Sequence, residues 1–460
     1  MRAADLLDVR AVGSVAEASP DHAPEPAEPR AHRRSGEARP AATKKLVVVG
    51  QGYVGLPLAL RAAARGYRVV GLDLDEERIE ALRGGRTFVE DVSDASLLAT
   101  LRNRRYVPTS DPRQCAGFDV AVVAVPTPLA DGAPDLSAIQ AASRVLARYL
   151  RPGATVILES TTYPGTTEEV VGPILEEGSD LVPGTDFHLG YSPERIDPGN
   201  RAFPFWKIPK VVSGVNERSL EMVGAFYSEI VNAIVPVSSP RVAEMTKLLE
   251  NTFRHVNIAL VNELAMFAWD LDIDIREVVD AASTKPFGFM RFVPGPGVGG
   301  HCLPIDPSYL SWRVMRSLGR SFRFVELAND VNAHMPDYVV ARITDLLNRK
   351  AKAVNGSRIL LLGLSFKPNT GDDRESPARV VAAQLLAAGA EVRAFDEHVE
   401  PKRCDPRVRR VDLTPDEVRS SDLVVVMTDH DGVPYDMVSA EAPAILDTRH
   451  RTTGPRVEHL

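Results

Sequence analysis

Lys44-Lys-Leu-Val-Val-Val49 runs directly into Gly50-Gln-Gly52-Tyr-Val-Gly55, and this stretch decides the fold of the chain. The first run is short and β-branched, as expected of a buried parallel strand. Residues 57–65 then favour a helix that closes at Gly66, and residues 67–73 favour a second strand that ends in Asp73. A GxGxxG motif alone is weak evidence. Strand, glycines, helix, strand and terminal acid in this order predict a doubly wound α/β domain of the Rossmann type.

The same stretch predicts a dinucleotide site. A helix N-terminus and bare glycine backbone suit a pyrophosphate, and Asp73 is placed to accept hydrogen bonds from ribose hydroxyls. Acidic residues follow at 75–77 and would repel a 2′-phosphate, so we expect NAD rather than NADP. The alternative for Asp73 is a plain turn residue at a strand end, which fits this setting less well.

Polar residues follow three further strands of this first half. Ligands of an open parallel sheet lie outside the carboxyl ends of its strands, so we expect these residues near the cofactor or substrate. For Thr166 and Thr167, helix capping is an equally good interpretation. The residues that follow the strands at 118–125, 154–159 and 188–192 are Pro126, Thr127, Ser160, Thr161, Glu194 and Arg195.

The middle of the chain, from about Ser239 to Leu271, has the apolar spacing of one or two long helices. Lys247, Asn251 and His255 lie four residues apart and share one face. They could supply donors to an oxyanion, or they could form a solvated face with Glu244 and Glu250 as ion-pair partners. Spacing alone favours the solvated face. A helix of this length between two α/β units is also a natural dimerisation surface. The apolar repeat is Val242, Met245, Leu248, Leu249, Phe253 and Val256.

A glycine-rich run, Gly295-Pro-Gly-Val-Gly299-Gly-His-Cys302, precedes Leu-Pro-Ile-Asp306-Pro307. Glycines allow close approach to a ligand, and successive backbone N–H groups can hold an anion. Donors beside Cys302 would favour its thiolate, which indicates covalent chemistry on a phosphorylated substrate. A plain loop with a buried cysteine is the alternative. Asp306 followed by Pro307 also fits the N-cap of a helix that ends before Gly319.

The last third repeats the α/β pattern without the glycine motif. Strands are predicted at 357–367, 391–396, 422–427 and 444–447, with a helix at 378–388. Gly363 is what remains of a fingerprint, so we expect no second dinucleotide. Lys367 and Arg374 lie at a strand end and a helix start, where they could bind another phosphate or nucleotide.

The length, net charge and cysteine content of the chain limit its possible binding partners. The chain has 460 residues and a net charge of −8, which argues against nucleic acid or an anionic membrane. Its three cysteines are widely spaced, which favours a reducing cytoplasm and gives no metal motif. No apolar run is long enough to span a bilayer. We predict a disordered extension at 1–42 and an α/β fold of two Rossmann-like doubly wound domains, at 43–236 and 336–460, joined by a long central helical region at 237–335.

These motifs, in this order, resemble the nucleotide-sugar 6-dehydrogenases of the UDP-glucose/GDP-mannose dehydrogenase family, over roughly residues 44 to 450. The resemblance implies NAD, a UDP-sugar bound by the last domain, a homodimer and a role in polysaccharide biosynthesis. It also implies a four-electron oxidation of C6 to a carboxylate, with Cys302 as nucleophile through a thiohemiacetal and a thioester. It favours the oxyanion role for Lys247 and Asn251.

The resemblance also assigns residues to roles. Asp306 would help to activate water, Glu194 would assist thioester hydrolysis, and Thr161 would position a water or the cofactor. The implied cofactor contacts are Gly50, Gly52, Tyr53, Val54, Gly55, Asp73, Arg78, Pro126, Thr127, Thr161 and Arg374. The implied substrate contacts are Glu194, Arg195, Lys247, Asn251, Arg254, Phe292, Gly295, Gly299 and Lys367.

The sugar is less constrained. Ser192-Pro-Glu-Arg195-Ile-Asp-Pro198 is most similar to the UDP-N-acetylglucosamine 6-dehydrogenase branch, since the UDP-glucose branch has a second glutamate where Pro198 stands. Arg195 could contact the C2 substituent or the new carboxylate. UDP-glucose and UDP-N-acetylmannosamine stay open as substrates. So do a two-electron hydroxyacid dehydrogenase, which has no need of Cys302, and a non-catalytic nucleotide-sugar binding protein.

Overall fold

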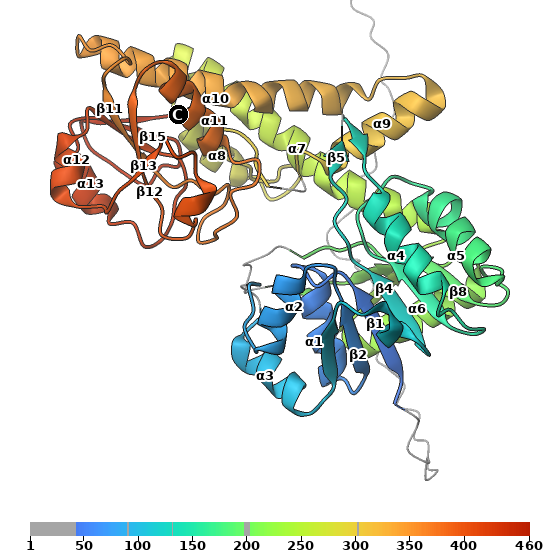
Figure 1. Ribbon diagram of the computed structural model, residues 1–460. Helices are drawn as coiled ribbons and strands as arrows, with labels where there is room; N and C mark the ends of the chain where they lie inside the picture. The colour runs from blue at the N-terminus through green and yellow to red at the C-terminus, as the bar shows by residue number, and fades with distance from the viewer. Residues whose placement is uncertain (1–42, 90–91, 131, 197–202, 301–302) are drawn as a thin grey trace, which may run out of the picture. The chain divides into compact units, whose positions relative to one another are not determined.

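The computed structural model describes residues 43–89, 92–130, 132–196, 203–300 and 303–460 (Figure 1). The sequence-based expectation for residues 1–42 lies outside the described residues, as do Asp197, Pro198, His301 and Cys302.

The first Rossmann sheet has the strand order β3-β2-β1-β4-β7-β8, and each neighbouring pair is parallel. This is the order of a doubly wound dinucleotide-binding fold. The predicted strands and the glycine turn after the first of them are therefore confirmed. The strands are β1 (Lys45–Val49), β2 (Arg68–Leu72), β3 (Tyr106–Thr109), β4 (Val120–Val123), β7 (Thr155–Leu158) and β8 (His188–Tyr191).

Successive side chains of β1 point to opposite faces of the sheet, and each face is covered by helices. Leu46 and Val48 pack with α1 and α6, whereas Val47 and Val49 pack with α4 and α5. The helices α1 and α6 therefore cover one face of the sheet, and α4 and α5 cover the other. Small additional pairs are β5 (Leu129–Ala130) with β6 (Ala133–Pro134), and β9 (Lys210–Val212) with β10 (Ile234–Pro236). The helices are α1 (Gly55–Ala64), α2 (Glu76–Arg83), α3 (Asp94–Arg102), α4 (Ser137–Ala147), α5 (Gly172–Ser179) and α6 (Glu217–Ile230).

The central region is helical, as predicted, and its first helix is continuous. α7 (Pro240–Asp270) starts after Ser239, whose hydroxyl accepts from the backbone N–H of Val242. This N-cap, with Pro240 in the first turn, sets the start of the helix. α7 packs along α10 (Arg323–Arg349), and α8 (Ile275–Ser283) and α9 (Asp306–Leu318) complete the region.

The last third forms a second sheet of the same design, β13-β12-β11-β14-β15-β16, again with parallel neighbours. The prediction of a second doubly wound unit is therefore confirmed. Its strands are β11 (Arg358–Leu362), β12 (Glu391–Phe395), β13 (Arg409–Arg410), β14 (Leu423–Val426), β15 (Ile445–Asp447) and β16 (Val457–His459). Its helices are α11 (Pro377–Ala387), α12 (Pro415–Ser420) and α13 (Tyr435–Glu441).

Candidate functional site

The glycine turn after β1 has the geometry of a dinucleotide cradle. A Cβ on Gly55 would lie 1.8 Å from the carbonyl oxygen of Gly50, so this position needs glycine for the helix to approach the strand. A Cβ on Gly52 would meet no atom within 4 Å, which leaves open space at the start of α1. A pyrophosphate fits that space, because backbone N–H groups point out of a helix N-terminus.

Asp73 lies directly after β2, and hydrogen bonds hold its carboxylate in place. Its carboxylate accepts from the backbone N–H of Gln51 at 2.7 Å and of Asp75 at 3.0 Å. The guanidinium of Arg78 donates to the same carboxylate at 2.9 Å and lies over the ring of Phe88. Asp73 is 9% exposed. The structure therefore places Asp73 and Arg78 together beside the glycine turn.

The polar turns after β4 and β7 are bonded to each other. The hydroxyl of Ser160 accepts from the N–H of Val125 at 2.9 Å and donates to its carbonyl at 2.8 Å. The Thr127 hydroxyl donates to the carbonyl of Thr161 at 2.8 Å. The predicted residues 126–127 and 160–161 thus lie side by side at the carboxyl edge of the sheet.

The polar face of α7 is buried, so the interpretation of a solvated face is wrong. Lys247 is 7% exposed, and Asn251 and His255 are 1% exposed each. Glu244, proposed as a surface ion-pair partner, is also buried; it accepts from the N–H groups of Gly165 and Thr167. The spacing of polar and apolar residues along a helix defines its faces but does not say which face packs against the rest of the protein. In α7 the polar face is the one that packs.

Asn251 and Asp306 connect α7 to α9. The amide nitrogen of Asn251 donates to the Asp306 carboxylate at 2.5 Å, and its amide oxygen accepts from Arg254 at 2.8 Å. Burial raises the pKa of Asp306 to about 6, against the opposing effects of Lys247, Asn251 and Arg254. A buried carboxylate whose pKa lies near neutrality, with a lysine and an amide at hand, can act as a base.

The interpretation of Asp306 as an N-cap is wrong. α9 begins at Asp306 itself, after Ile305, and no side chain caps it. The Asp306 carboxylate points to Asn251 instead of to its own helix N-terminus. The predicted end of the helix is confirmed, since Gly319 follows in the left-handed conformation.

Glu194 and Arg195 follow β8 and face different partners. Glu194 Oε1 accepts from the N–H groups of Arg195 and Ile196, and Glu194 Oε2 accepts from Lys210 at 3.1 Å. The Arg195 guanidinium pairs with Glu250 of α7 at 2.7 Å and donates to the carbonyl of Pro209. Arg195 thus connects the loop after β8 to α7. Its partner Glu250 lies between Lys247 and Asn251 in the helix.

The glycine-rich run packs against the loop before α11. A Cβ on Gly299 would lie 2.6 Å from the Cβ of Phe366 and 2.7 Å from the carbonyl oxygen of Glu375. The N–H of Gly300 donates to the carbonyl of Arg374 at 2.9 Å. Close packing of two backbones therefore requires glycine at 299. Cys302 itself lies outside the described residues.

Four of the predicted ligand residues lie in this run or beside it. Gly295 donates from its N–H to the amide oxygen of Asn262 on α7. The ring of Phe292 contacts that of Phe253 at 5.9 Å between centroids. Arg374 pairs with Asp372 at 2.6 Å, and Lys367 is half-buried in the loop that leads to it.

Arg276 and Arg449 are partly buried arginines beside Gly295, and sequence reasoning did not single them out as candidate site residues. The Arg449 guanidinium lies 2.8 Å from the place of a Gly295 Cβ and donates to the carbonyl of Met427. Arg276 of α8 donates to the carbonyl of Arg449 at 3.0 Å. Their burial lowers the pKa of both. The signal in the sequence was the position of Arg449 two residues past the end of β15, where parallel-sheet ligands bind.

In the second sheet, the acidic residue at the corresponding strand end is hydrogen-bonded to groups of its own domain. Asp396 follows β12 as Asp73 follows β2. Burial alone would raise the pKa of Asp396, but His430 and backbone amides hold it well below its ordinary value. The carboxylate accepts from His430 and from the N–H groups of Leu364, Ser365, His398 and Val399. This arrangement leaves little acceptor capacity for a ribose.

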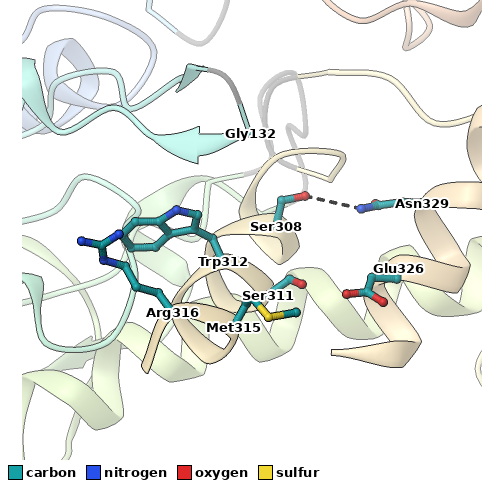
Figure 2. Close-up of a pocket in the computed structure, with 8 residues that line it drawn as sticks. All are labelled: Gly132, Ser308, Ser311, Trp312, Met315, Arg316, Glu326 and Asn329. Atoms are coloured by element: carbon teal, nitrogen blue, oxygen red, sulfur yellow. Dashed lines mark hydrogen bonds between the residues drawn. The ribbon is translucent and has the colours of Figure 1, made fainter. Parts of the chain in front are cut away.

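A pocket of about 400 Å³ lies beside α9 and α10 (Figure 2). Figure 2 shows Ser308 and Asn329 joined by a hydrogen bond at its edge, with Trp312 and Arg316 further along α9. None of the residues predicted for the site lines this pocket. We therefore define the candidate site by the side-chain contacts above.

Two features are absent from the described part of the chain, a helix that could span a membrane and a group of side chains that could hold a metal ion. No helix in it has the length and hydropathy to cross a bilayer. Among the same residues, no group of three or more His, Cys, Asp or Glu side chains is arranged to hold a metal ion.

The strand order of the first sheet and the cradle at Gly52 are those of a dinucleotide-dependent dehydrogenase. The chain belongs to the UDP-glucose/GDP-mannose dehydrogenase family: its NAD binding domain matches residues 44–231, its central domain residues 241–334 and its UDP binding domain residues 360–453. NAD is accordingly the cofactor.

Similar proteins act on more than one sugar. The chain is 39% identical to the UDP-N-acetyl-D-glucosamine 6-dehydrogenase of Pseudomonas aeruginosa over 77% of this chain and 83% of that protein. The structure of a UDP-D-ManNAc dehydrogenase from Pyrococcus horikoshii superposes with a TM-score of 0.82 at 31% identity, covering 90% of this chain and 98% of that one. A UDP-glucose dehydrogenase from Pyrobaculum islandicum has the same TM-score at 28% identity, covering 92% and 98%.

Proposed function

We propose that this enzyme oxidises C6 of a UDP-N-acetylhexosamine to the carboxylate, with UDP-N-acetylglucosamine as the first candidate. The 39% identical relative that is named for that sugar supports this choice. UDP-N-acetylmannosamine is the second candidate, supported by the similar Pyrococcus horikoshii structure. The overall fold does not separate either from UDP-glucose, because a UDP-glucose dehydrogenase superposes equally well.

The contact between Asn251 and Asp306, one helical turn from Lys247, is the observation that carries the proposed chemistry. We propose that Lys247 and Asn251 stabilise the oxyanions that form at C6, since both are hydrogen-bond donors with buried side chains. Asp306 takes up the proton of an attacking water. Thr161, beside Thr127 at the edge of the first sheet, helps to place the reacting groups.

Cys302 is the proposed nucleophile. Its thiolate adds to the C6 aldehyde from the first oxidation and forms a thiohemiacetal. Loss of a second hydride gives a thioester; water then attacks the carbonyl carbon, the C–S bond breaks and the thiolate leaves. NAD, when bound in the cradle at Gly52 and Asp73, accepts the hydride in each oxidation.

The UDP part of the substrate is assigned to the second α/β domain, which the UDP binding domain of the family matches at residues 360–453. We propose Lys367, Arg276 and Arg449 as its cationic contacts, since guanidinium groups suit phosphate oxygens. Arg374, which the resemblance places near the cofactor, is paired with Asp372 on an exposed loop. The domain boundaries proposed above, at 43–236, 237–335 and 336–460, follow these roles.

We further propose a homodimer through α7. Its exposed face carries apolar side chains along its length, including Leu249 at 63% and Leu260 at 52% exposure. A continuous exposed apolar stripe of this kind is typical of a subunit interface. The other members of the stripe are Val242, Met245, Phe253, Leu264, Phe267 and Leu271.

The test of the function is the amount of NADH formed per UDP-sugar consumed, at completion, for the wild type and for Cys302→Ala. Two NADH per UDP-N-acetylglucosamine, with no acid product from the variant, would support the covalent four-electron route. One NADH per sugar, unaffected by the substitution, would mean a simple alcohol dehydrogenase. Parallel reactions with UDP-N-acetylmannosamine and UDP-glucose identify the sugar.

A further inference from the structure

Lys210 on β9 is a buried lysine that no sequence motif singled out. Its side chain is 5% exposed. Its ammonium group is bonded to the carboxylate of Glu159, at the end of β7, and to Glu194 at 3.1 Å. It also lies over the ring of Tyr227, 5.2 Å from the centroid. A buried ammonium is costly unless it is paired, and both of its partners are acids.

The lysine completes the set of donors around Glu194. Glu194 Oε1 accepts from the N–H groups of Arg195 at 2.6 Å and Ile196 at 2.5 Å. Lys210 is the donor to the other oxygen. The backbone bonds hold one oxygen of the carboxylate, and the orientation of the second depends on Lys210. A carboxylate can accept about four hydrogen bonds, so one direction stays open for a water or a ligand.

The electrostatic effects of Lys210, Glu159 and Glu194 on one another change the pKa values of Lys210 and Glu159. Burial raises the pKa of Glu159 and the nearby Glu194 raises it further, against the lowering by Lys210. Tyr227 donates to Glu159 Oε1 at 2.8 Å, while Glu159 Oε2 is buried without a hydrogen-bond partner. Burial lowers the pKa of Lys210, but Glu159 and Glu194 together raise it above its ordinary value. Lys210 is therefore the cation that the carboxylates of Glu159 and Glu194 share.

We propose that Lys210 is a positioning residue, which fixes the carboxylate of Glu194 so that it can hold, as a hydrogen-bond acceptor, the water that attacks the thioester while Asp306 takes up its proton. Lys210 acts through Glu194 and does not touch the substrate. Glu159 and Tyr227 hold the ammonium from behind. This inference rests on the proposed function, because Glu194 has its hydrolytic role only in the four-electron reaction.

The test variant is Glu159→Gln/Lys210→Met. It removes both buried charges behind Glu194 together, whereas Lys210→Met alone would leave two buried carboxylates facing each other and could fail to fold. Glu159→Gln alone is the matched control, because it keeps the Lys210–Glu194 pair. Lys210→Arg tests rescue by a second cation.

For the double variant we expect a melting temperature near that of the wild type, a KM for UDP-sugar within about twofold, and a kcat lower by about 10- to 100-fold. A rapid burst of NADH, two per active site, followed by slow turnover would place the loss in thioester hydrolysis. Glu159→Gln should turn over like the wild type, and Lys210→Arg should regain most of the kcat. A folded double variant with wild-type kcat would overturn the proposal.

A crystal structure of the double variant gives a readout that does not depend on activity. Displacement of the Glu194 carboxylate, with its backbone unchanged, supports positioning by Lys210. An unmoved carboxylate contradicts it. If the wild type oxidises no UDP-sugar, the proposed function fails, and this comparison still decides whether Lys210 positions Glu194.

Discussion

The side-chain amide of Asn251 donates a hydrogen bond of 2.5 Å to the carboxylate of Asp306 and joins the middle of α7 to the first residue of α9. This contact brings together two segments that are 55 residues apart. It also leaves a carboxylate fully buried, which is unfavourable for stability unless it serves a function. The Asp306 site is therefore where stability and activity should respond in opposite directions.

Asp306→Asn should stabilise the protein at pH 8 and reduce activity by about 100-fold or more, as expected for loss of a general base. The pKa of Asp306 is about 6 in the folded protein, above the 3.8 of an unperturbed Asp. The contribution of the protonated Asp306 carboxyl to the free energy of unfolding is therefore fully present below pH 3.8 and is lost as the pH rises through 6. At pH 8 the buried charge therefore costs about 2–3 kcal/mol, which the neutral asparagine avoids.

Thermal unfolding of both proteins from pH 4 to pH 8 measures this difference. The gain in melting temperature of the variant should be largest at pH 8 and should shrink toward pH 4. A gain that does not depend on pH would contradict the raised pKa. In the wild type, kcat should fall as the pH drops through about 6, because the proposed base becomes protonated.

Asp73→Asn should raise the KM for NAD by about tenfold and leave kcat nearly unchanged, because it weakens hydrogen bonds to the ribose that are the same throughout the reaction. Loss of the negative charge should also improve the use of NADP. Glu80→Gln, an exposed acid on α2 outside the run at 75–77, is the control. Steady-state kinetics with both cofactors would refute the assignment if Asp73→Asn and Glu80→Gln behaved alike.

Gly299→Ala should destabilise the protein by about 1–3 kcal/mol, since the added methyl group meets Phe366 Cβ and the Glu375 carbonyl at well under contact distance. The displaced run leads to Cys302, so kcat should fall as well. Gly84→Ala is the matched control, because its Cβ would find ordinary contacts, with nothing nearer than 3.4 Å. Chemical denaturation together with the rate of Cys302 alkylation checks both effects; equal behaviour of the two variants would argue against tight packing at Gly299.

Leu249→Glu combined with Leu260→Glu should convert the proposed dimer into a monomer, because two charges per subunit would be buried at the centre of the interface. Val380→Glu is the control, an exposed apolar residue at 45% exposure on α11. Sedimentation velocity measures the outcome. A dimer that survives both substitutions on α7 would exclude this helix as the interface.

Much of the fold and part of the site followed from local sequence. The strand before Gly50, the acid after β2 and the start of the long helix near Ser239 are each encoded within a few residues, so their prediction needed no knowledge of tertiary contacts. The family resemblance likewise rests on short motifs, and the matches to the family's three domains confirm it.

The tertiary structure decided which surfaces meet. Periodicity on α7 defines a polar face and an apolar face, but only packing against α9 and α10 shows that the polar face, with Lys247, is the buried one. The same holds for Lys210, whose two carboxylate partners come from separate strand ends, and for Gly299, whose neighbours lie more than 60 residues further along the chain. Charge pairing and backbone contact depend on through-space distance, which a linear pattern of residues does not contain.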